Sequence, residues 1–235
     1  KSIRIPTILD VKNMRFSCNT DNEKIVIVYT GNPSTSKELF RPVFEALREN
    51  SLFRDKFELH IYGPDKERVI ANIDNDEELY RMVKDNVFIH EKVPQEKIGE
   101  ILRNADYQMF IRPLRRSSNA GFPTKLAESM AVGTPVITNL TGDIGLYLED
   151  GANGFLANGV SSSSIKDVFE KILKNLCIFC TFYLISLSLW FRIFCRPEAP
   201  VRAKNDCRSD GRYGEFLLDR HCGGAHRAAL CLRPG

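Results

Sequence analysis

The stretch from Asn119 to Asn139 constrains the fold of this chain more than any other. It reads NAGFPTKLAESMAVGTPVITN, which predicts a loop, a helix and a strand in close succession. Pro123 stands where the first helical residue is expected, because its φ is preset and it has no N–H to leave unpaired. Gly133 is expected to end the helix as a left-handed cap, and Val136 to begin a buried strand. The apolar positions between them recur at helical spacing: Leu126, Ala127, Met130 and Ala131.

The polar face of this predicted helix carries Thr124, Lys125 and Glu128 at spacings of three and four, so the three side chains are expected to lie together. The first N–H groups of a helix have no partner within it, and they favour an anion at that end. Glu128, one turn further along, is suited to accept hydrogen bonds from sugar hydroxyls. An ordinary loop, helix and strand is the alternative, because Gly-Phe-Pro before a helix is not a phosphate motif by itself.

The seventeen residues GFPTKLAESMAVGTPVI, at positions 121–137, resemble the signature of retaining GT-B glycosyltransferases of family four, also called group 1. In that family the corresponding segment holds the nucleotide-sugar donor in the carboxyl-terminal lobe. The resemblance therefore implies that the chain is one lobe of a GT-B fold and that the donor is its partner. The residues implied to contact the donor in this segment are Gly121, Phe122, Pro123, Thr124, Lys125 and Glu128.

The alternation of strands and helices predicts an α/β fold with a doubly wound, mostly parallel, Rossmann-like sheet. The expected strands are 24–29, 57–62, 87–89 and 106–113, and the expected helices are 37–48, 65–84 and 93–105, all before the central stretch. Residues 21–175 form the predicted nucleotide-sugar-binding lobe. Residues 1–20 are expected to be a crossing or linker segment, and the start at Lys1 without Met or a signal pattern predicts a piece of a longer protein.

Three further loops follow predicted strands and are expected at the ligand edge of the sheet. Gly31 and Lys37 fit a Gly…Lys element that the resembled family places near the donor pyrophosphate, although Asn32 stands where many relatives carry Arg. A solvated lysine at a helix start is the alternative for Lys37. Arg112 ends the fourth strand and is the preferred anion contact, with a salt bridge that fixes the loop as its alternative. Gly142 and Asp143 belong to the third loop.

Composition fits a globular protein, since 43% of the 235 residues are hydrophobic and 27% are charged. The formal charge of +3 divides into +4 from Leu176 onward and −1 before it, so no nucleic-acid partner is predicted. Only Cys18 precedes residue 176, which predicts a reduced, cytoplasmic domain. A peripheral location at the cytoplasmic face of the membrane is a further alternative. Asp74-Asn75-Asp76 precedes a predicted helix, so helix-capping carboxylates are favoured over a metal site.

From Leu176 the sequence pattern changes, and nothing beyond it resembles the family. Residues 176–191 carry no charge, and the remainder to 235 is rich in Arg, Gly, Pro and Cys. Three explanations stay open: a non-native translation, a membrane anchor through 176–193 with a basic tail, or a divergent packed helix. Cys177 and Cys180 have metal-ligand spacing but lack a second pair, so no metal site is predicted.

Two departures from the family limit the catalytic prediction. The first of its two motif acids would fall at Ala120, and the acid expected after Gly142 has no clear equivalent. Contacts to the donor sugar would then come from backbone or from Ser117, Ser118 and Asn119. The resemblance implies transfer of a hexose-type sugar with retention to a glycan, lipid or other acceptor, as in polysaccharide biosynthesis, without a metal or other cofactor.

No catalytic residue is assigned, because the family completes its site with an amino-terminal acceptor lobe that the resemblance implies is missing from this chain. The fragment alone is therefore expected to be inactive. Two other functions stay open: a non-catalytic nucleotide-sugar-binding domain, and a GT-B sugar-nucleotide epimerase. The epimerase would need His60 or His90, and His60 is expected to be a core residue of its strand.

Overall fold

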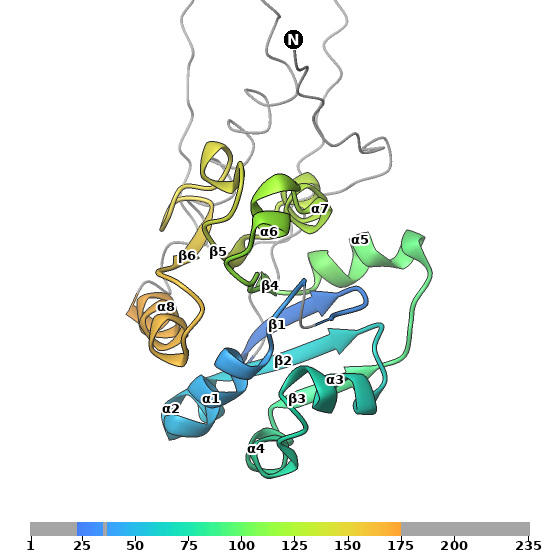
Figure 1. Ribbon diagram of the computed structural model, residues 1–235, viewed down its shortest axis with the longest axis vertical. Coiled ribbons are helices and arrows are strands. Elements are labelled where there is room, and N and C mark those ends of the chain that lie inside the picture. Colours follow the sequence, from blue (N-terminus) through green and yellow to red (C-terminus); the bar gives the residue numbers. More distant parts are fainter. Residues whose placement is uncertain (1–22, 35–36, 175–235) are drawn as a thin grey trace, which may run out of the picture. The chain divides into compact units, whose positions relative to one another are not determined.

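The computed structural model describes residues 23–34 and 37–174. The predicted crossing segment 1–20 and the tail 176–235, with every alternative for it, lie outside the described residues. Within the described residues the chain alternates between strands and helices, and the helices lie on both sides of one sheet (Figure 1).

The sheet of the described residues has six strands in the order β3-β2-β1-β4-β5-β6, and every neighbouring pair is parallel. The strands are β1 (Ile25–Thr30), β2 (Phe57–Tyr62), β3 (Val87–His90), β4 (Tyr107–Phe110), β5 (Val136–Asn139) and β6 (Gly154–Ala157). The predicted doubly wound, parallel α/β fold is confirmed. The order reverses between β1 and β4, and open α/β sheets bind ligands at the carboxyl ends of the strands at such a point.

The helices are α1 (Arg41–Glu49), α2 (Ser51–Lys56), α3 (Lys66–Asn72), α4 (Glu77–Val83), α5 (Gln95–Arg103), α6 (Arg116–Ala120), α7 (Thr124–Val132), the short η1 (Ile144–Leu146) and α8 (Ser162–Lys174). Two helix predictions were wrong in extent. The predicted helix 37–48 begins only at Arg41, because the N–H groups of Leu39 and Phe40 bond to distant partners. The predicted helix 65–84 is two helices, broken where Asp74 and Asn75 adopt positive φ.

The break between α3 and α4 explains the acidic triplet. Asp76 accepts a hydrogen bond from the N–H of Leu79 at 2.9 Å, so it caps α4 as predicted. Asp74 lies 3.3 Å from the guanidinium of Arg41. No group of three potential metal-ligating side chains occurs among the described residues, and the triplet is part of a helix junction.

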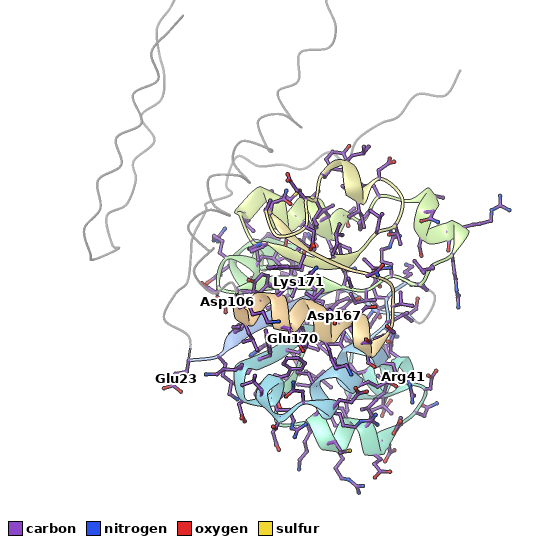
Figure 2. The ribbon with its side chains drawn as sticks, turned by 90° about the vertical axis from the view of Figure 1, so that its left-hand side faces the viewer. Glu23, Arg41, Asp106, Asp167, Glu170 and Lys171 are labelled. Atoms are coloured by element: carbon purple, nitrogen blue, oxygen red, sulfur yellow. The ribbon has the colours of Figure 1, made fainter. Side chains whose placement is uncertain are left out.

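The core is divided between the two faces of the sheet by the alternation of strand side chains. Ile27 and Tyr29 belong to the larger cluster, whereas Val28 packs with Leu102 of α5 and Val132 of α7 on the opposite face. Helix α8 buries its apolar stripe in the larger cluster: Ile165, Val168, Phe169 and Ile172. Its outer face carries Asp167, Glu170 and Lys171, which Figure 2 shows along the exposed side of the helix.

Candidate functional site

A buried ion pair lies where β1 and β4 meet. The ammonium of Lys125, at the start of α7, lies 3.0 Å from Oε1 of Glu38, and the two side chains are 17% and 10% exposed. The hydroxyl of Tyr29, near the end of β1, donates to Oε2 of Glu38 at 3.2 Å. Burial and then the charge of Glu38 raise the pKa of the Tyr29 phenol far above its usual range, so the phenol stays protonated.

The loops after β1 and β2 contact each other beside this ion pair. Gly31 has φ +132°, and a Cβ at this position would lie 3.2 Å from both Cε and Nζ of Lys125. Gly63 has φ +118°, and its Cβ would lie only 2.4 Å from the carbonyl oxygen of Gly31. Both positions therefore require glycine, for the backbone angle and for the close approach. The Lys125 ammonium is thereby held against the loop that the sequence predicts to face the ligand.

Arg112 follows β4 at the same edge of the sheet. The side-chain amide of Asn139 fixes its main chain, since Asn139 Oδ1 accepts from the Arg112 N–H at 2.7 Å and Nδ2 donates to the Arg112 carbonyl at 2.8 Å. The guanidinium donates to the carbonyl of Gly121 at 3.0 Å and to Oγ1 of Thr141 at 3.3 Å. Burial lowers the pKa of Arg112, and the charge of Glu38 opposes that effect.

Arg112 thus connects the three loops that follow β4, α6 and β5, by hydrogen bonds to neutral oxygens. The expected alternative, a salt bridge that fixes the loop, is not what these contacts show. The guanidinium carries its full charge at neutral pH, because an arginine side chain is not deprotonated in proteins. It is a cation held in place just after the carboxyl end of β4.

The start of α7 differs by one residue from the prediction. Pro123 is the residue before the helix, with ψ 118°, and Thr124 is the first helical residue. Gly133 ends the helix with φ 81°, so the predicted left-handed cap is confirmed. The ring of Phe122 packs edge-on against Tyr147, with centroids 5.0 Å apart, and so joins this helix start to the segment after β5.

The predicted polar face of α7 does not act as one cluster, because its members contact different elements. Lys125 contacts Glu38, whereas Glu128 accepts a hydrogen bond from Nε2 of Gln95, the first residue of α5, at 3.3 Å. Thr124 is exposed. Glu128 therefore lies toward the loop after β3, and Lys125 lies toward the loop after β1.

The other predicted contacts lie on the loops after β1 and β5. The side chain of Lys37 is exposed, and its N–H bonds to the carbonyl of Ser34 at 2.8 Å. Gly142 has φ +54°, and its N–H donates to Oδ1 of Asn119 at 3.0 Å. Asp143 is half-buried beside it. These contacts join the loop after β5 to α6.

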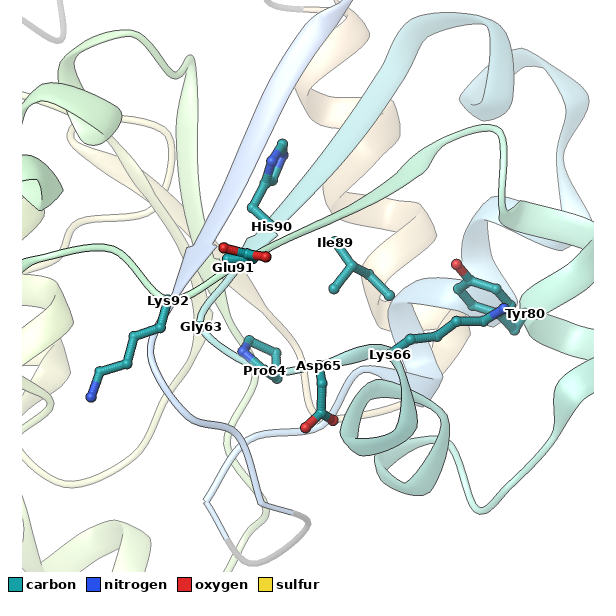
Figure 3. A pocket seen from close by; sticks show the side chains of 9 residues that line it. All are labelled: Gly63, Pro64, Asp65, Lys66, Tyr80, Ile89, His90, Glu91 and Lys92. Atoms are coloured by element: carbon teal, nitrogen blue, oxygen red, sulfur yellow. The ribbon is translucent and has the colours of Figure 1, made fainter.

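A cavity of about 560 Å³ opens at the carboxyl ends of β2 and β3, and none of the predicted contact residues lines it (Figure 3). It is lined by Gly63, Pro64, Asp65, Lys66, Tyr80, Ile89, His90, Glu91 and Lys92. Lys66 and Tyr80 lie together on one side, with the ammonium 5.0 Å from the ring centroid, and Lys92 lies on the other. Gly63 links this cavity to the Gly31 loop.

His60 is not the core residue that was expected, since its side chain is 21% exposed. Its Nδ1 lies 2.9 Å from Nε2 of His90, and the two rings are stacked. Its Nε2 lies 3.5 Å from the Glu58 carboxylate, which is long for a hydrogen bond. Burial, and then the neighbouring His60, lower the pKa of His90. The two imidazoles thus bond to each other on one face of the sheet.

Residues 10–176 match the family model of Glycosyl transferases group 1. This chain belongs to that family. No curated protein matches it in sequence. Among the described residues, no helix combines the length and apolar character needed to cross a membrane.

Solved structures of GT-B glycosyltransferases share the fold. The C-terminal domain of the group 1 protein LpcC from Francisella tularensis has a TM-score of 0.62 at 14% identity, over 79% of this chain and 98% of that domain. TarM from S. aureus has a TM-score of 0.61 at 16% identity, over 81% of this chain and 36% of TarM. HepE from Anabaena, in complex with UDP and glucose, has a TM-score of 0.58 at 14% identity, over 72% of this chain. The chain spans 44% of the length of HepE.

Sequence reasoning did not find Glu38, Tyr29 or Asn139 as parts of this site. Tyr29 and Asn139 belong to apolar strands. A polar side chain within one or two positions of the carboxyl end of such a strand is the feature that could have indicated a site residue. Glu38 follows the predicted Lys37 directly, and a carboxylate in a loop with few other charges could have indicated it. Its partner Lys125 is 87 positions away, and such a pairing cannot be deduced from local spacing.

Proposed function

We propose that this chain is the donor-binding lobe of a glycosyltransferase and that it binds the diphosphate of a nucleotide sugar between β1 and β4. The observation that carries the proposal is the convergence of Lys125, Arg112 and the start of α7 at the point where the strand order reverses. The Glu38 carboxylate lies 3.0 Å from the Lys125 ammonium, and its charge favours the charged form of Arg112 by raising its pKa. The same carboxylate therefore interacts with both cations.

Each of these groups suits a departing diphosphate. A guanidinium and an ammonium bind phosphate oxygens by charge-assisted hydrogen bonds. The N–H groups of Thr124 and Lys125 begin a nine-residue helix, where an anion is favoured. Together they would stabilise the negative charge that develops when the sugar leaves the nucleoside diphosphate. No metal is required by this scheme, because the cations come from the chain itself.

The remaining predicted contacts would complete the donor site. Glu128 would accept hydrogen bonds from ribose or sugar hydroxyls, and Lys37 and Asp143 would lie on the loops around the ligand. We propose a hexose-type donor and transfer with retention, as the family resemblance implies, and a cytoplasmic location, which the single cysteine before residue 176 favours. Transfer would need a second, acceptor-binding lobe, since the reaction takes place in the cleft between two lobes.

A non-catalytic nucleotide-sugar-binding domain is the second candidate, and Ala120 favours it. This residue is exposed at the end of α6, where the family signature has an acid. An alanine there removes a carboxylate from the side of the site that faces the sugar. The diphosphate contacts through Lys125 and Arg112 are unaffected by this change.

Calorimetric titration with UDP and UDP-glucose tests the proposal, with UDP as the first probe because the HepE structure contains it. We expect the chain to bind UDP weakly and to transfer no sugar alone. Lys125→Met and Arg112→Ala should each weaken binding by about tenfold or more, the effect of a charge-assisted hydrogen bond. Lys171→Met is the matched control. It also removes an ammonium that pairs with a carboxylate, since Lys171 of α8 lies 2.9 Å from Asp150.

Three results would contradict the proposal. A folded chain, shown by its circular dichroism, that binds none of the common sugar nucleotides would exclude a working donor site. Equal losses in Lys171→Met and Lys125→Met would show that the effect is one of overall charge. Sugar transfer by the chain alone would contradict the need for a second lobe.

A further inference from the structure

We infer that Glu38 is a positioning residue of the donor site, which holds the ammonium of Lys125 against the Gly31 loop in the orientation that a diphosphate requires. The inference rests on the proposed function and adds a residue that the sequence did not indicate. It is carried by the way in which Glu38 itself is fixed, by the contacts of its carboxylate and by what else anchors α7.

The main chain around Glu38 is fixed from two sides. The N–H of Leu39 donates to the carbonyl of Ile111, just after β4, at 2.8 Å. The side chain of Asn72, at the end of α3, accepts from the N–H of Phe40 at 2.8 Å and donates to the carbonyl of Glu38 at 3.0 Å. These three bonds interrupt the expected helix. They fix the main chain of Glu38 in the segment before α1, from which its carboxylate reaches Tyr29 of β1 and Lys125 of α7.

The carboxylate of Glu38 uses both oxygens. Oε2 accepts from the hydroxyl of Tyr29, and Oε1 accepts from the ammonium of Lys125. Since the Tyr29 phenol stays protonated, it is a neutral donor that orients the carboxylate. The ring of Tyr29 also lies under the ammonium, with Nζ 5.1 Å from its centroid. The Lys125 ammonium is therefore held by a charge on one side and a ring face on another.

The ion pair is not needed to hold α7 on the sheet. The hydroxyl of Ser129, one turn along α7, donates to Oε1 of Gln108 at 2.7 Å, and Nε2 of Gln108 donates to Oγ1 of Thr30 at 2.9 Å. All three side chains are buried, so this network already joins α7 to β4 and β1. A buried ion pair by itself contributes little net stability, because desolvation offsets the attraction.

What the ion pair does fix is the conformation of a long side chain. An ammonium has three donors, and Glu38 uses one of them. Ordering a free lysine on ligand binding costs rotamer entropy, which a side chain already held in place does not incur. Glu38 therefore prepares Lys125 for an anion that arrives beside Gly31.

Positioning and simple charge predict effects of opposite sign on anion binding. A carboxylate next to an anion site repels the anion, so if Glu38 acted only through its charge, its neutralisation would strengthen diphosphate binding. If it acts by holding Lys125, the same change weakens binding. The sign of the change in UDP affinity thus separates the two roles. A merely structural role of Glu38 would weaken UDP binding equally whether or not Lys125 is present.

The test is a double-mutant cycle of Glu38→Gln and Lys125→Met, with UDP as the probe and uridine as the control without phosphate. Glu38→Gln should weaken UDP binding by about tenfold, as expected for a lost charge-assisted hydrogen bond, and leave uridine unchanged. In the Lys125→Met background it should have no further effect. Glu45→Gln is the matched control, since Glu45 pairs with Arg41 at 2.9 Å on the outer part of α1.

A second measurement uses the unaltered chain, in case Glu38→Gln does not fold. The ammonium of Lys125 should give a slowly exchanging proton signal in NMR spectra, and UDP should shift that signal. Tighter UDP binding by Glu38→Gln, equal weakening in both backgrounds, or an unshifted ammonium signal in the UDP-bound chain would overturn the inference alone. A chain that binds no UDP would overturn the proposed function together with it.

Discussion

Asn139→Ala should separate the stability of the fold from the geometry of the anion site. The Asn139 side chain is fully buried and makes two hydrogen bonds to the main chain of Arg112, one as acceptor at 2.7 Å and one as donor at 2.8 Å. A typical net value of about 0.5–1.5 kcal/mol for each bond predicts a loss of about 1–3 kcal/mol in the free energy of unfolding. Arg112 is half-buried, so water can replace part of what is lost.

Asn153→Ala is the matched control for this substitution. Asn153 is also buried, accepts from the N–H of Glu149 at 2.8 Å and donates to the carbonyl of Tyr147 at 2.8 Å, but it lies in the turn before β6. The two variants should lose similar free energies of unfolding. Only Asn139→Ala should also weaken UDP binding, by about three- to tenfold, because Arg112 then loses its fixed position.

Urea unfolding followed by circular dichroism, with an unchanged m-value, gives the two stability differences. Calorimetric titration with UDP gives the affinities. A loss of less than about 0.5 kcal/mol in Asn139→Ala, the range of ordinary surface substitutions, would refute the assigned role of the two hydrogen bonds. Equal weakening of UDP binding in both variants would refute the link from Asn139 through Arg112 to the anion.

Two further predictions concern the neighbouring strand ends. Gly63→Ala should lower the melting temperature more than Gly151→Ala, because both have positive φ but only the Cβ at Gly63 would meet a backbone atom, the Gly31 carbonyl oxygen, at 2.4 Å; equal losses would show that the backbone angle alone matters. The lowered pKa of His90 in the folded chain means that the unfolded chain binds the proton more strongly. The free energy of unfolding should therefore be unaffected by His90 above a pH of about 6.5, the ordinary histidine pKa, and should fall as the pH drops from there toward the lower pKa of the folded chain. Urea unfolding between pH 7.5 and 5 checks this, and His90→Gln should lose that part of the pH dependence.

Local sequence pattern predicted the strands and the central helix, although the strand expected over 106–113 extends only from Tyr107 to Phe110. Continuous apolar runs such as Lys24 to Tyr29 predicted buried parallel strands, and β1 lies between two neighbours in the sheet. The Gly133 cap was predicted because a left-handed residue after an apolar stripe has a local cause.

The parts that sequence did not predict depend on distant partners. The N–H groups of Leu39 and Phe40 bond to Ile111 and Asn72, and these bonds replace the first turn of the expected helix. Lys125 was placed on a polar helix face from its spacing, but its contact with Glu38 depends on how α7 packs beside β1. Residue spacing fixes which side chains share a helix face, and packing decides what each of them contacts.

The buried side chain of Gln108 has a consequence for local unfolding of this domain. Its amide is fully buried in the middle of β4 and has its donor on Thr30 and its acceptor on Ser129. If α7 detached from the sheet by itself, the acceptor oxygen would lose its partner inside an apolar layer, at a cost of about 1–3 kcal/mol. Helix α7 and the two central strands should therefore open as one cooperative unit, with similar free energies of opening in amide hydrogen exchange. The helix start that is proposed to receive the diphosphate is then as rigid as the centre of the sheet, and ligand binding at this point does not have to order it.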